Sequence, residues 1–448
     1  MLSRIDYIFL VLSLLTFAVC QRQKLCEVTT RSEMTYELTD EQKQQLERQG
    51  YNLSQNPYNG IYKFVVNPKN GHTYVNAIRA FTTTGMTPYT LGVQKSYEYN
   101  APIYPFPSFE ENQPPNGIIS AVSTTLDNCD RIWILDTGSF SLNDPVQLYD
   151  VALLAYSLTE NRMIYRYPFP RKLTSSDGPS SVTAVIIDDS RGCDKIKAIV
   201  SDTIQGRIYV FDYETERSWV VPHWSFEYDP KYANFPYGNT TLFLPGGVYS
   251  INLTPPIGKR GVKYLMYSSY AGITIYTVPL SILYREELWT KGVSLWRPYS
   301  KSSLLNKNEK GNQFLNKIKS FFEKEKEDEF TYIDVNRYFK AIGTWESLMG
   351  AYCNMDVEKG ILYCALPKER GISAWSIYKP FHTIKVVARN NELLKYPAVI
   401  ATKINLKGET EIVISTSNIV VSWKLLFLID FLFFFILANF PGNDVSTS

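Results

Sequence analysis

The residue types that form metal or nucleophile sites are few and scattered in this 448-residue chain. Its three histidines, His72, His223 and His382, show no His-x-x-x-His spacing, and no Cys-x-x-Cys pair accompanies them, so no zinc-binding pattern is present. No Gly-x-Ser-x-Gly elbow, Walker loop or dinucleotide-binding glycine motif occurs either. We therefore expect no metal, no cofactor and no motif-borne catalytic residue. A tautomerase stays open as a class, because it needs only a few acid and base groups that leave no motif.

The elements that would position a site are short strands. Apolar runs rich in β-branched and aromatic residues recur in pairs, and each pair is joined by a turn containing Asp, Asn or Gly. This recurrence predicts an all-β protein built from the blades of a β-propeller, with a β-sandwich as the alternative. One residue from the middle of each pair marks the units at Trp133, Ile199, Tyr264, Tyr363 and Ile412.

A charged segment, residues 301–328, interrupts the series of strand pairs. Within it Phe314, Leu315, Ile318 and Phe322 fall at helical spacing, and Lys and Glu occupy the other face. We expect a solvated surface helix inserted between blades. A membrane-surface role is less favoured, because both signs of charge are interspersed.

The N-terminus has the features of a secretory signal. Arg4 precedes an apolar stretch at residues 7–19, and small residues follow it. We expect residues 1–20 to be removed as a signal peptide, which makes the protein extracellular, and residues 21–57 to lead into the β domain. Candidate glycosylation sites that fit the same secretory route are Asn52, Asn239 and Asn252.

The charge balance argues against one class of partner. Lys and Arg total 46 and Asp and Glu total 44, so the chain has no overall positive field that would hold phosphates. We expect no nucleic-acid partner, and we expect a monomer.

The C-terminal tail, residues 422–448, is atypical for the end of a β domain. Residues 425–440 are almost wholly apolar but include Asp430, are short for a bilayer span, and are followed by no Lys or Arg. Three interpretations of this tail remain: a membrane anchor, a C-terminus altered by splicing, or a replacement for the closing strand. We favour a tail appended to a complete domain, because a strand around residues 62–66 could pair with the last unit near residue 421.

The motifs of the strand pairs resemble those of the major royal jelly protein and yellow family. The residues Asn128 to Gly138, NCDRIWILDTG, are similar to the hallmark of that family. The resemblance extends over roughly residues 58–418 and implies a six-bladed propeller with a cavity on its axis. We place the propeller domain at residues 58–421. Further matches in family order are TPYTL (87–91), PFPSF (105–109), SDTIQGRIYVFD (201–212), SW (218–219), GGVYSINLTP (246–255) and GISAW (371–375).

The cysteines suit an oxidising compartment. Cys129 and Cys193 stand just before corresponding strands of successive units, and the resemblance implies a disulfide between them. Cys353 and Cys364 would lie opposite each other across a hairpin, so we expect a second disulfide there. Relatives often carry a cysteine where this chain has Ala374, so a rearranged second bridge, with Cys26 or another cysteine free, stays open.

The resemblance also implies where a ligand would bind. The family includes salivary proteins that bind biogenic amines, and Thr402 and Asn418 fall near positions that contact ligand in those proteins. The alternative is that Thr402 and Asn418 only complete a strand and a turn. Asp136 is interpreted first as a turn residue bonded to backbone, and a ligand-binding carboxylate is the alternative that keeps it among the candidate ligand-binding residues. An axial cavity lined by aromatic, carboxylate and amide side chains would hold an ammonium by cation–π contact and charged hydrogen bonds.

The function expected from the sequence is therefore extracellular binding of a small amine or a related aromatic metabolite in the axial cavity. One alternative, suggested by the resemblance and by no motif, is dopachrome conversion by a tautomerase. The other is a structural, nutritive or cuticle-associated role. A membrane contact is expected only through the C-terminal tail.

Overall fold

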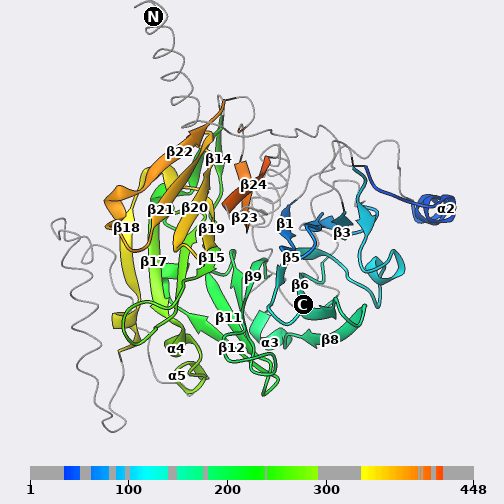
Figure 1. Ribbon diagram of the computed structural model, residues 1–448, viewed down its shortest axis with the longest axis horizontal. Coiled ribbons are helices and arrows are strands. Elements are labelled where there is room, and N and C mark those ends of the chain that lie inside the picture. Colours follow the sequence, from blue (N-terminus) through cyan, green and yellow to red (C-terminus); the bar gives the residue numbers. More distant parts are fainter. Residues whose placement is uncertain are drawn as a thin grey trace, which may run out of the picture.

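The computed structural model describes residues 35–50, 62–79, 87–95, 101–139, 149–174, 180–237, 240–290, 334–391, 394, 397–404 and 410–416. Nearly all regular structure in these residues is β (Figure 1).

Five antiparallel sheets of four strands form the body of the protein, and in each sheet the strands are adjacent in chain order. Consecutive strands pair antiparallel, so each sheet is a meander. Blade 1 is β1 (Lys63–Val66), β2 (Thr73–Asn76), β3 (Leu91–Gln94) and β4 (Tyr104–Pro105), and blade 2 is β5 (Ala121–Leu126), β6 (Arg131–Asp136), β7 (Ala152–Ser157) and β8 (Arg162–Pro168). Blade 3 is β9 (Val182–Asp188), β10 (Lys197–Asp202), β11 (Arg207–Asp212) and β12 (Arg217–Pro222). Blade 4 is β15 (Val248–Leu253), β16 (Tyr264–Ser269), β17 (Thr274–Pro279) and β18 (Lys340–Thr344), and blade 5 is β19 (Tyr352–Asp356), β20 (Ile361–Leu366), β21 (Gly371–Ser376) and β22 (Lys385–Arg389).

The first strands of the five blades, together with β23 (Pro397–Ile404), form an inner ring. β5 lies beside β1 and β9, β15 lies beside β9 and β19, and β23 lies beside β19 and β1. Because the sheets pack face to face around one axis, the architecture is a β-propeller and not a sandwich.

The predicted number of blades is corrected from six to five. The remaining position in the ring holds a two-stranded sheet, in which β23 pairs with β24 (Thr410–Thr416), in the part of the chain that the structure describes. The expected pairing of the 62–66 strand with this last unit is also wrong, because β1 pairs with β2 as the innermost strand of blade 1. β1 and β23 are neighbours in the ring without being strands of one sheet.

The residues that marked the repeated units share one structural position. Each lies in the second strand of its sheet, in β6, β10, β16, β20 and β24 respectively. Blade 1 was missed as a unit because its strands have four residues or fewer, too short for a clear alternation of apolar and polar residues.

The apolar core lies between neighbouring blades. Between blades 2 and 3 the side chains of Trp133, Tyr209 and Phe211 are completely buried in one cluster. Aromatic rings of this size remove much apolar area from water, so they hold adjacent blades together.

The two predicted disulfides are both present. Cys129, in the β5–β6 turn, pairs with Cys193, in the β9–β10 turn, and so ties blade 2 to blade 3. The backbone N–H of Asn128 donates to the Asp189 carboxylate at 2.7 Å across the same junction.

The second disulfide lies within blade 5. Cys353 of β19 and Cys364 of β20 are directly paired in the antiparallel register and joined through their sulfurs. The hairpin expected from the sequence is therefore correct, and the rearranged bridge is not observed.

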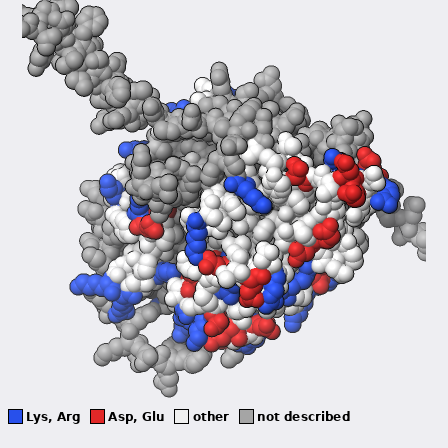
Figure 2. Space-filling model, turned by 45° about the vertical axis from the view of Figure 1, so that its right-hand side comes forward, with Lys and Arg blue, Asp and Glu red and all other residues white. Residues whose placement is uncertain are grey.

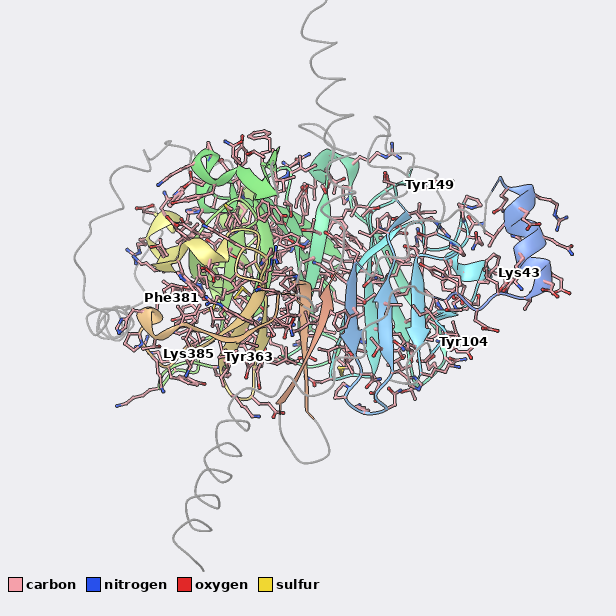
Figure 3. The ribbon with its side chains drawn as sticks, turned by 90° about the horizontal axis from the view of Figure 1, so that it is seen from above. Lys43, Tyr104, Tyr149, Tyr363, Phe381 and Lys385 are labelled. Atoms are coloured by element: carbon pink, nitrogen blue, oxygen red, sulfur yellow. A yellow bond between two sulfur atoms is a disulfide. The ribbon has the colours of Figure 1, made fainter. Side chains whose placement is uncertain are left out.

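Helices are short and peripheral. The longest described one, α2 (Asp40–Arg48), begins with a capping box at Thr39 and lies at the outer side of blade 1, where Figure 3 labels Lys43. The others are α3 (Arg171–Thr174), α4 (Leu280–Leu283), α5 (Glu287–Thr290) and the 3-10 helices Glu110–Asn112, Trp224–Phe226, Pro230–Tyr232, Val335–Tyr338, Glu346–Leu348 and Phe381–Thr383, and a further hairpin is β13 (Asn234–Tyr237) with β14 (Thr240–Phe243).

Acidic and basic side chains alternate over the described surface that Figure 2 shows. In the described residues, oppositely charged side chains pair directly at several positions, including Arg162 with Glu160 and Arg171 with Asp150, both at 2.5 Å. This face therefore carries no broad patch of a single sign.

The expected signal peptide, the insertion at residues 301–328 and the tail at residues 422–448 lie outside the described residues. Within the described residues, no helix has both the length and the apolar character needed to cross a membrane.

Candidate ligand-binding cavity

A cavity of about 120 Å³ lies on the propeller axis. Its wall is made by β1, β5, β9, β15, β19 and β23, each of which contributes at least two residues. Alternation along a strand turns every second side chain toward the axis, so a short segment of each inner strand suffices to line the cavity.

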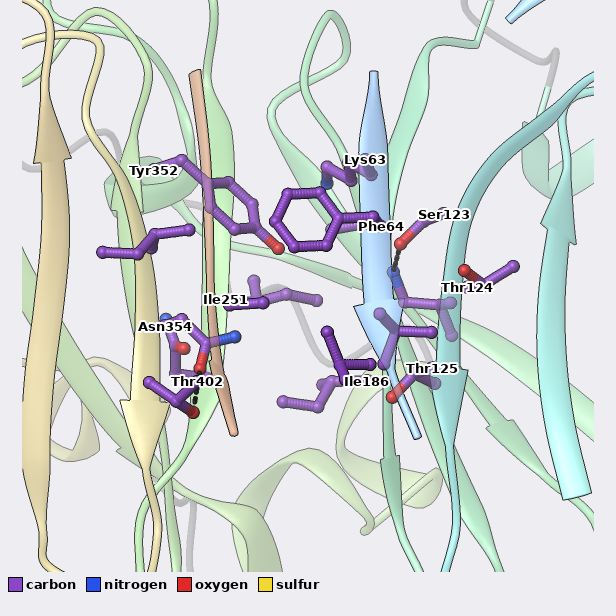
Figure 4. A pocket seen from close by; sticks show the side chains of 17 residues that line it. Lys63, Phe64, Ser123, Thr124, Thr125, Ile186, Ile251, Tyr352, Asn354 and Thr402 are labelled. Atoms are coloured by element: carbon purple, nitrogen blue, oxygen red, sulfur yellow. Dashed lines mark hydrogen bonds between the residues drawn. The ribbon is translucent and has the colours of Figure 1, made fainter. Parts of the chain in front are cut away.

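The cavity has two chemically different ends (Figure 4). At one end lie Lys63, Phe64 and Tyr352, and at the other lie Asn354 and Thr402, with aliphatic side chains between them. The Thr402 hydroxyl donates to Asn354 Oδ1 at 3.1 Å. The first end offers an amine and aromatic rings, and the second offers an amide and a hydroxyl.

None of the residues that line the cavity is an aspartate or glutamate. The polar groups among them are hydroxyls and amides, apart from Lys63. Their positions are set by local hydrogen bonds: Ser123 Oγ accepts from the Val185 N–H at 3.3 Å, and Asn252 Nδ2 donates to Ser250 Oγ at 3.2 Å.

Lys63 is the single charged residue of the described lining, and it is 3% exposed. Its Nζ donates to the backbone carbonyl of Thr183 on β9. No carboxylate of the described residues forms a salt bridge with it. Burial lowers the pKa of Lys63 to about 7 from 10.5, because the ammonium loses its hydration.

Tyrosine rings surround the Lys63 amine. Nζ lies 4.7 Å from the ring centre of Tyr352, 5.5 Å from that of Tyr249 and 5.8 Å from that of Tyr62. Burial raises the pKa of the Tyr352 hydroxyl to about 12, so the ring stays protonated at neutral pH. The amine is therefore surrounded by aromatic rings and by no carboxylate of the described residues.

The three ligand-binding residues expected from the sequence have different positions. Thr402 lines the cavity. Asn418 lies outside the described residues. Asp136 is completely buried at the end of β6 and does not line the cavity.

The Asp136 carboxylate organises the turn after β6. It accepts hydrogen bonds from the backbone N–H groups of Ile119 at 2.9 Å, Ser120 at 2.8 Å and Gly138 at 3.0 Å. Gly138 has φ +66°, and a Cβ there would come within 2.4 Å of the Tyr149 carbonyl oxygen. The hallmark Asp-Thr-Gly sequence thus has the turn role that its residue types favoured.

Asp136→Asn is expected to lower the free energy of unfolding by about 2 kcal/mol, because a neutral amide supports three buried N–H donors less well than a carboxylate. Ligand affinity measured on the folded variant should be unchanged. A loss of affinity without a loss of stability in urea titrations would instead give Asp136 a direct ligand role.

Sequence reasoning missed Lys63 and Tyr352. Lys63 sits in an alternating strand, YKFVV, where a lysine ordinarily faces solvent. No local sequence feature distinguishes Lys63 from a surface lysine, because whether its side chain points toward the propeller axis depends on how the blades pack against one another.

A Ser-His-Asn arrangement also occurs, but away from the cavity. His223 Nδ1 lies 2.6 Å from Ser225 Oγ, and His223 Nε2 lies 3.1 Å from Asn336 Oδ1. Ser225 is 3% exposed, its hydroxyl contacts the Tyr267 hydroxyl at 2.5 Å, and burial lowers the pKa of His223 to about 3. An enclosed hydroxyl beside so weak a base is a structural network and not a nucleophile.

The structure describes one of the three candidate glycosylation sites, Asn252. Asn252 is 4% exposed and lines the cavity, which leaves no room for a glycan in the folded protein. Asn52 and Asn239 lie outside the described residues. Within the described ranges, no group of three or more His, Cys, Asp or Glu side chains is close enough to hold a metal ion.

Comparisons with known proteins agree with the motifs. Residues 119–329 match the family model "Major royal jelly protein". A dopaminechrome tautomerase of Drosophila melanogaster is 28% identical over 213 residues, which cover 45% of this chain and 44% of that protein. The L-dopachrome tautomerase yellow-f of the same species is 26% identical over 157 residues, covering 34% of this chain and 36% of that protein. Protein yellow of Drosophila melanogaster is 25% identical over 207 residues, covering 45% and 38%.

Each of these matches spans less than half of the relative's own length. They fall on a chain whose described residues form a propeller, with the hallmark motif in blade 2 and the disulfide expected from it. The family model and these relatives together support membership of the major royal jelly protein and yellow family.

Proposed function

We propose that this protein is a secreted binder of a small aromatic metabolite, which it holds in the axial cavity. The observation that carries the proposal is an axial cavity with an amine and aromatic rings at one end and an amide–hydroxyl pair at the other. Convergent polar groups in an otherwise apolar cavity are typical of ligand sites. The two disulfides suit an oxidising compartment.

The size of the cavity limits the ligand. Cavities of roughly 150 Å³ hold one benzene ring, and this one measures about 120 Å³. A single aromatic ring fits with small side-chain movements. The ring would lie against the Ile186 and Ile251 side chains, with its substituents directed to the two polar ends.

The charge of the lining favours oxygen-bearing ligands over cationic ones. The described lining contains Lys63 and no carboxylate, so a ligand ammonium would find no counter-ion there and would meet a protein amine. A phenol, carbonyl or carboxylate group would accept a hydrogen bond from Lys63. Among the expected ligands, this favours an aromatic metabolite related to the biogenic amines over a protonated amine.

A second candidate function is tautomerisation of an aromatic ligand of this kind. Lys63 is an ionisable group in the cavity whose pKa, about 7, suits proton transfer at neutral pH. Two of the relatives bear the names of dopaminechrome and dopachrome tautomerases. Loss of dopachrome absorbance faster than its spontaneous decay would support this function, and a rate equal to the spontaneous one would exclude it.

Calorimetric titration of the purified protein tests the binding proposal. Serotonin, dopamine, histamine and octopamine should be compared with catechol and hydroxyphenylacetate, and we expect saturable heat with at least one compound and tighter binding of the ligands that lack an ammonium. Thr402→Val, which removes a cavity hydroxyl with little change of shape, should weaken binding about tenfold. Thr383→Val, which removes a hydroxyl on the outer surface that donates to the Pro380 carbonyl oxygen, should leave it unchanged.

Absence of heat across the whole panel, with a folded sample, would contradict the proposal. A structural or nutritive role would then be favoured. Equal effects of Thr402→Val and Thr383→Val would place the ligand outside the axial cavity.

A further inference from the structure

Among the described residues, Lys63 and Lys197 are the buried lysines, and their environments differ. Lys197 is also buried, but its Nζ lies 2.5 Å from the Asp212 carboxylate, which compensates its charge. Lys63 has one backbone carbonyl and three tyrosine rings around it, and no ion pair with a described residue. A lysine placed in this way keeps an amine facing a cavity, without a partner that would hold the proton on it.

We propose that Lys63 condenses reversibly with the carbonyl group of an aromatic aldehyde or ketone bound in the axial cavity, forming an imine. This inference rests on the proposed function, because it uses the same cavity, and it extends that function from reversible binding to covalent capture.

The step balances with groups that are present. The neutral Nζ attacks the carbonyl carbon, which forms a C–N bond and opens the C=O double bond, and a proton moves from nitrogen to oxygen to give a carbinolamine. Loss of its hydroxyl as water then forms the C=N bond, and hydrolysis reverses the reaction. No oxidant or reductant is required.

The surroundings of Lys63 suit both parts of this step. The hydroxyl of Tyr352 points into the cavity beside the amine and, being protonated, can donate to the departing oxygen (Figure 4). The groups facing Nζ are the Tyr62 ring next to it, the Thr183 carbonyl from β9, Tyr249 from β15 and Tyr352 from β19. Since none of these is an anion at neutral pH, the population of neutral amine is set by burial.

Reductive trapping tests the proposal on the intact protein. Benzaldehyde, a neutral single ring of a size that suits the cavity, is added with cyanoborohydride at pH 7, and labelled peptides are mapped by mass spectrometry. We expect the Lys63 peptide to carry the benzyl group at least ten times faster than the peptides of exposed lysines such as Lys385. Lys197, buried but paired with Asp212, should stay unlabelled.

Two comparisons make the result decisive. Labelling of exposed lysines should rise about tenfold per pH unit between pH 7 and 9, whereas that of Lys63 should rise little. An aromatic ligand identified by calorimetry should slow labelling at Lys63 alone. If Lys63 is labelled no faster than Lys385 in folded protein, the imine is excluded, and saturable ligand heat in the same sample would leave the binding function standing. Fast labelling of Lys63 without any ligand heat would support the imine and contradict reversible amine or phenol binding.

Discussion

Replacing Cys129 and Cys193 together by serine is expected to lower the free energy of unfolding by about 4 kcal/mol. The bridge closes a loop with a sequence separation of 64 residues, and the conformational entropy that it removes from the unfolded chain grows with the length of that loop. The bridge also joins turns of two different blades, so its loss removes a covalent link between blades 2 and 3. Urea unfolding of the double variant and of the wild type measures the difference.

The matched control is the double variant of Cys353 and Cys364. That bridge spans only 11 residues and joins strands that are already paired by backbone hydrogen bonds, so its loss should cost less, about 3 kcal/mol. A smaller loss for the 129–193 pair than for the 353–364 pair would contradict the loop-entropy argument. It would indicate that polar contacts such as Asn128 with Asp189 already hold the two blades together.

Lys63→Met is expected to raise the free energy of unfolding at pH 7 by on the order of 4 kcal/mol. Burial lowers the pKa of Lys63 to about 7 in the folded protein, against 10.5 in the unfolded chain. At any pH between these two values the unfolded chain binds the proton more tightly, so the lysine favours unfolding. A methionine of similar length fills the same space without a charge.

The pH dependence of this difference follows from the same two pKa values. Below about pH 7 the lysine is protonated in both states and its full cost is present. From pH 7 to 10.5 the cost decreases by about 1.4 kcal/mol per pH unit, because the unfolded chain binds more protons than the folded protein. Urea unfolding at pH 7, 8 and 9 should therefore show the stabilities of wild type and Lys63→Met converging as pH rises.

Lys197→Met is the control for replacing a buried lysine. It leaves the Asp212 carboxylate buried without its cation, so it should destabilise the protein by a few kcal/mol. Equal destabilisation by Lys63→Met and Lys197→Met would show that Lys63 has a structural role and that its burial is fully compensated. Stabilisation by Lys63→Met alone would identify a residue that costs stability, as functional residues often do.

Local patterns in the sequence determined the strands, the turns and the hairpin that pairs Cys353 with Cys364. The alternation of apolar and polar residues and the turn residues between runs depend on neighbours in the chain, so Trp133, Ile199, Tyr264, Tyr363 and Ile412 could be assigned to equivalent strands without a structure. The opposition of Cys353 and Cys364 follows in the same way from the length of one hairpin.

The tertiary structure alone decided the number of four-stranded blades and the chemistry of the cavity. Blade 1 has strands too short to show a period in the sequence. Which strands lie beside β1 depends on how the blades close into a ring, and that closure involves residues far apart in the chain. For the same reason the local sequence predicts that Lys63 is a surface lysine, although Lys63 lines the axial cavity. The turn role of Asp136, in contrast, is favoured by the Asp-Thr-Gly sequence, and its carboxylate accepts hydrogen bonds from backbone N–H groups. A strand's period of two specifies two faces, and only the packing of six inner strands around one axis determines which face lines the cavity.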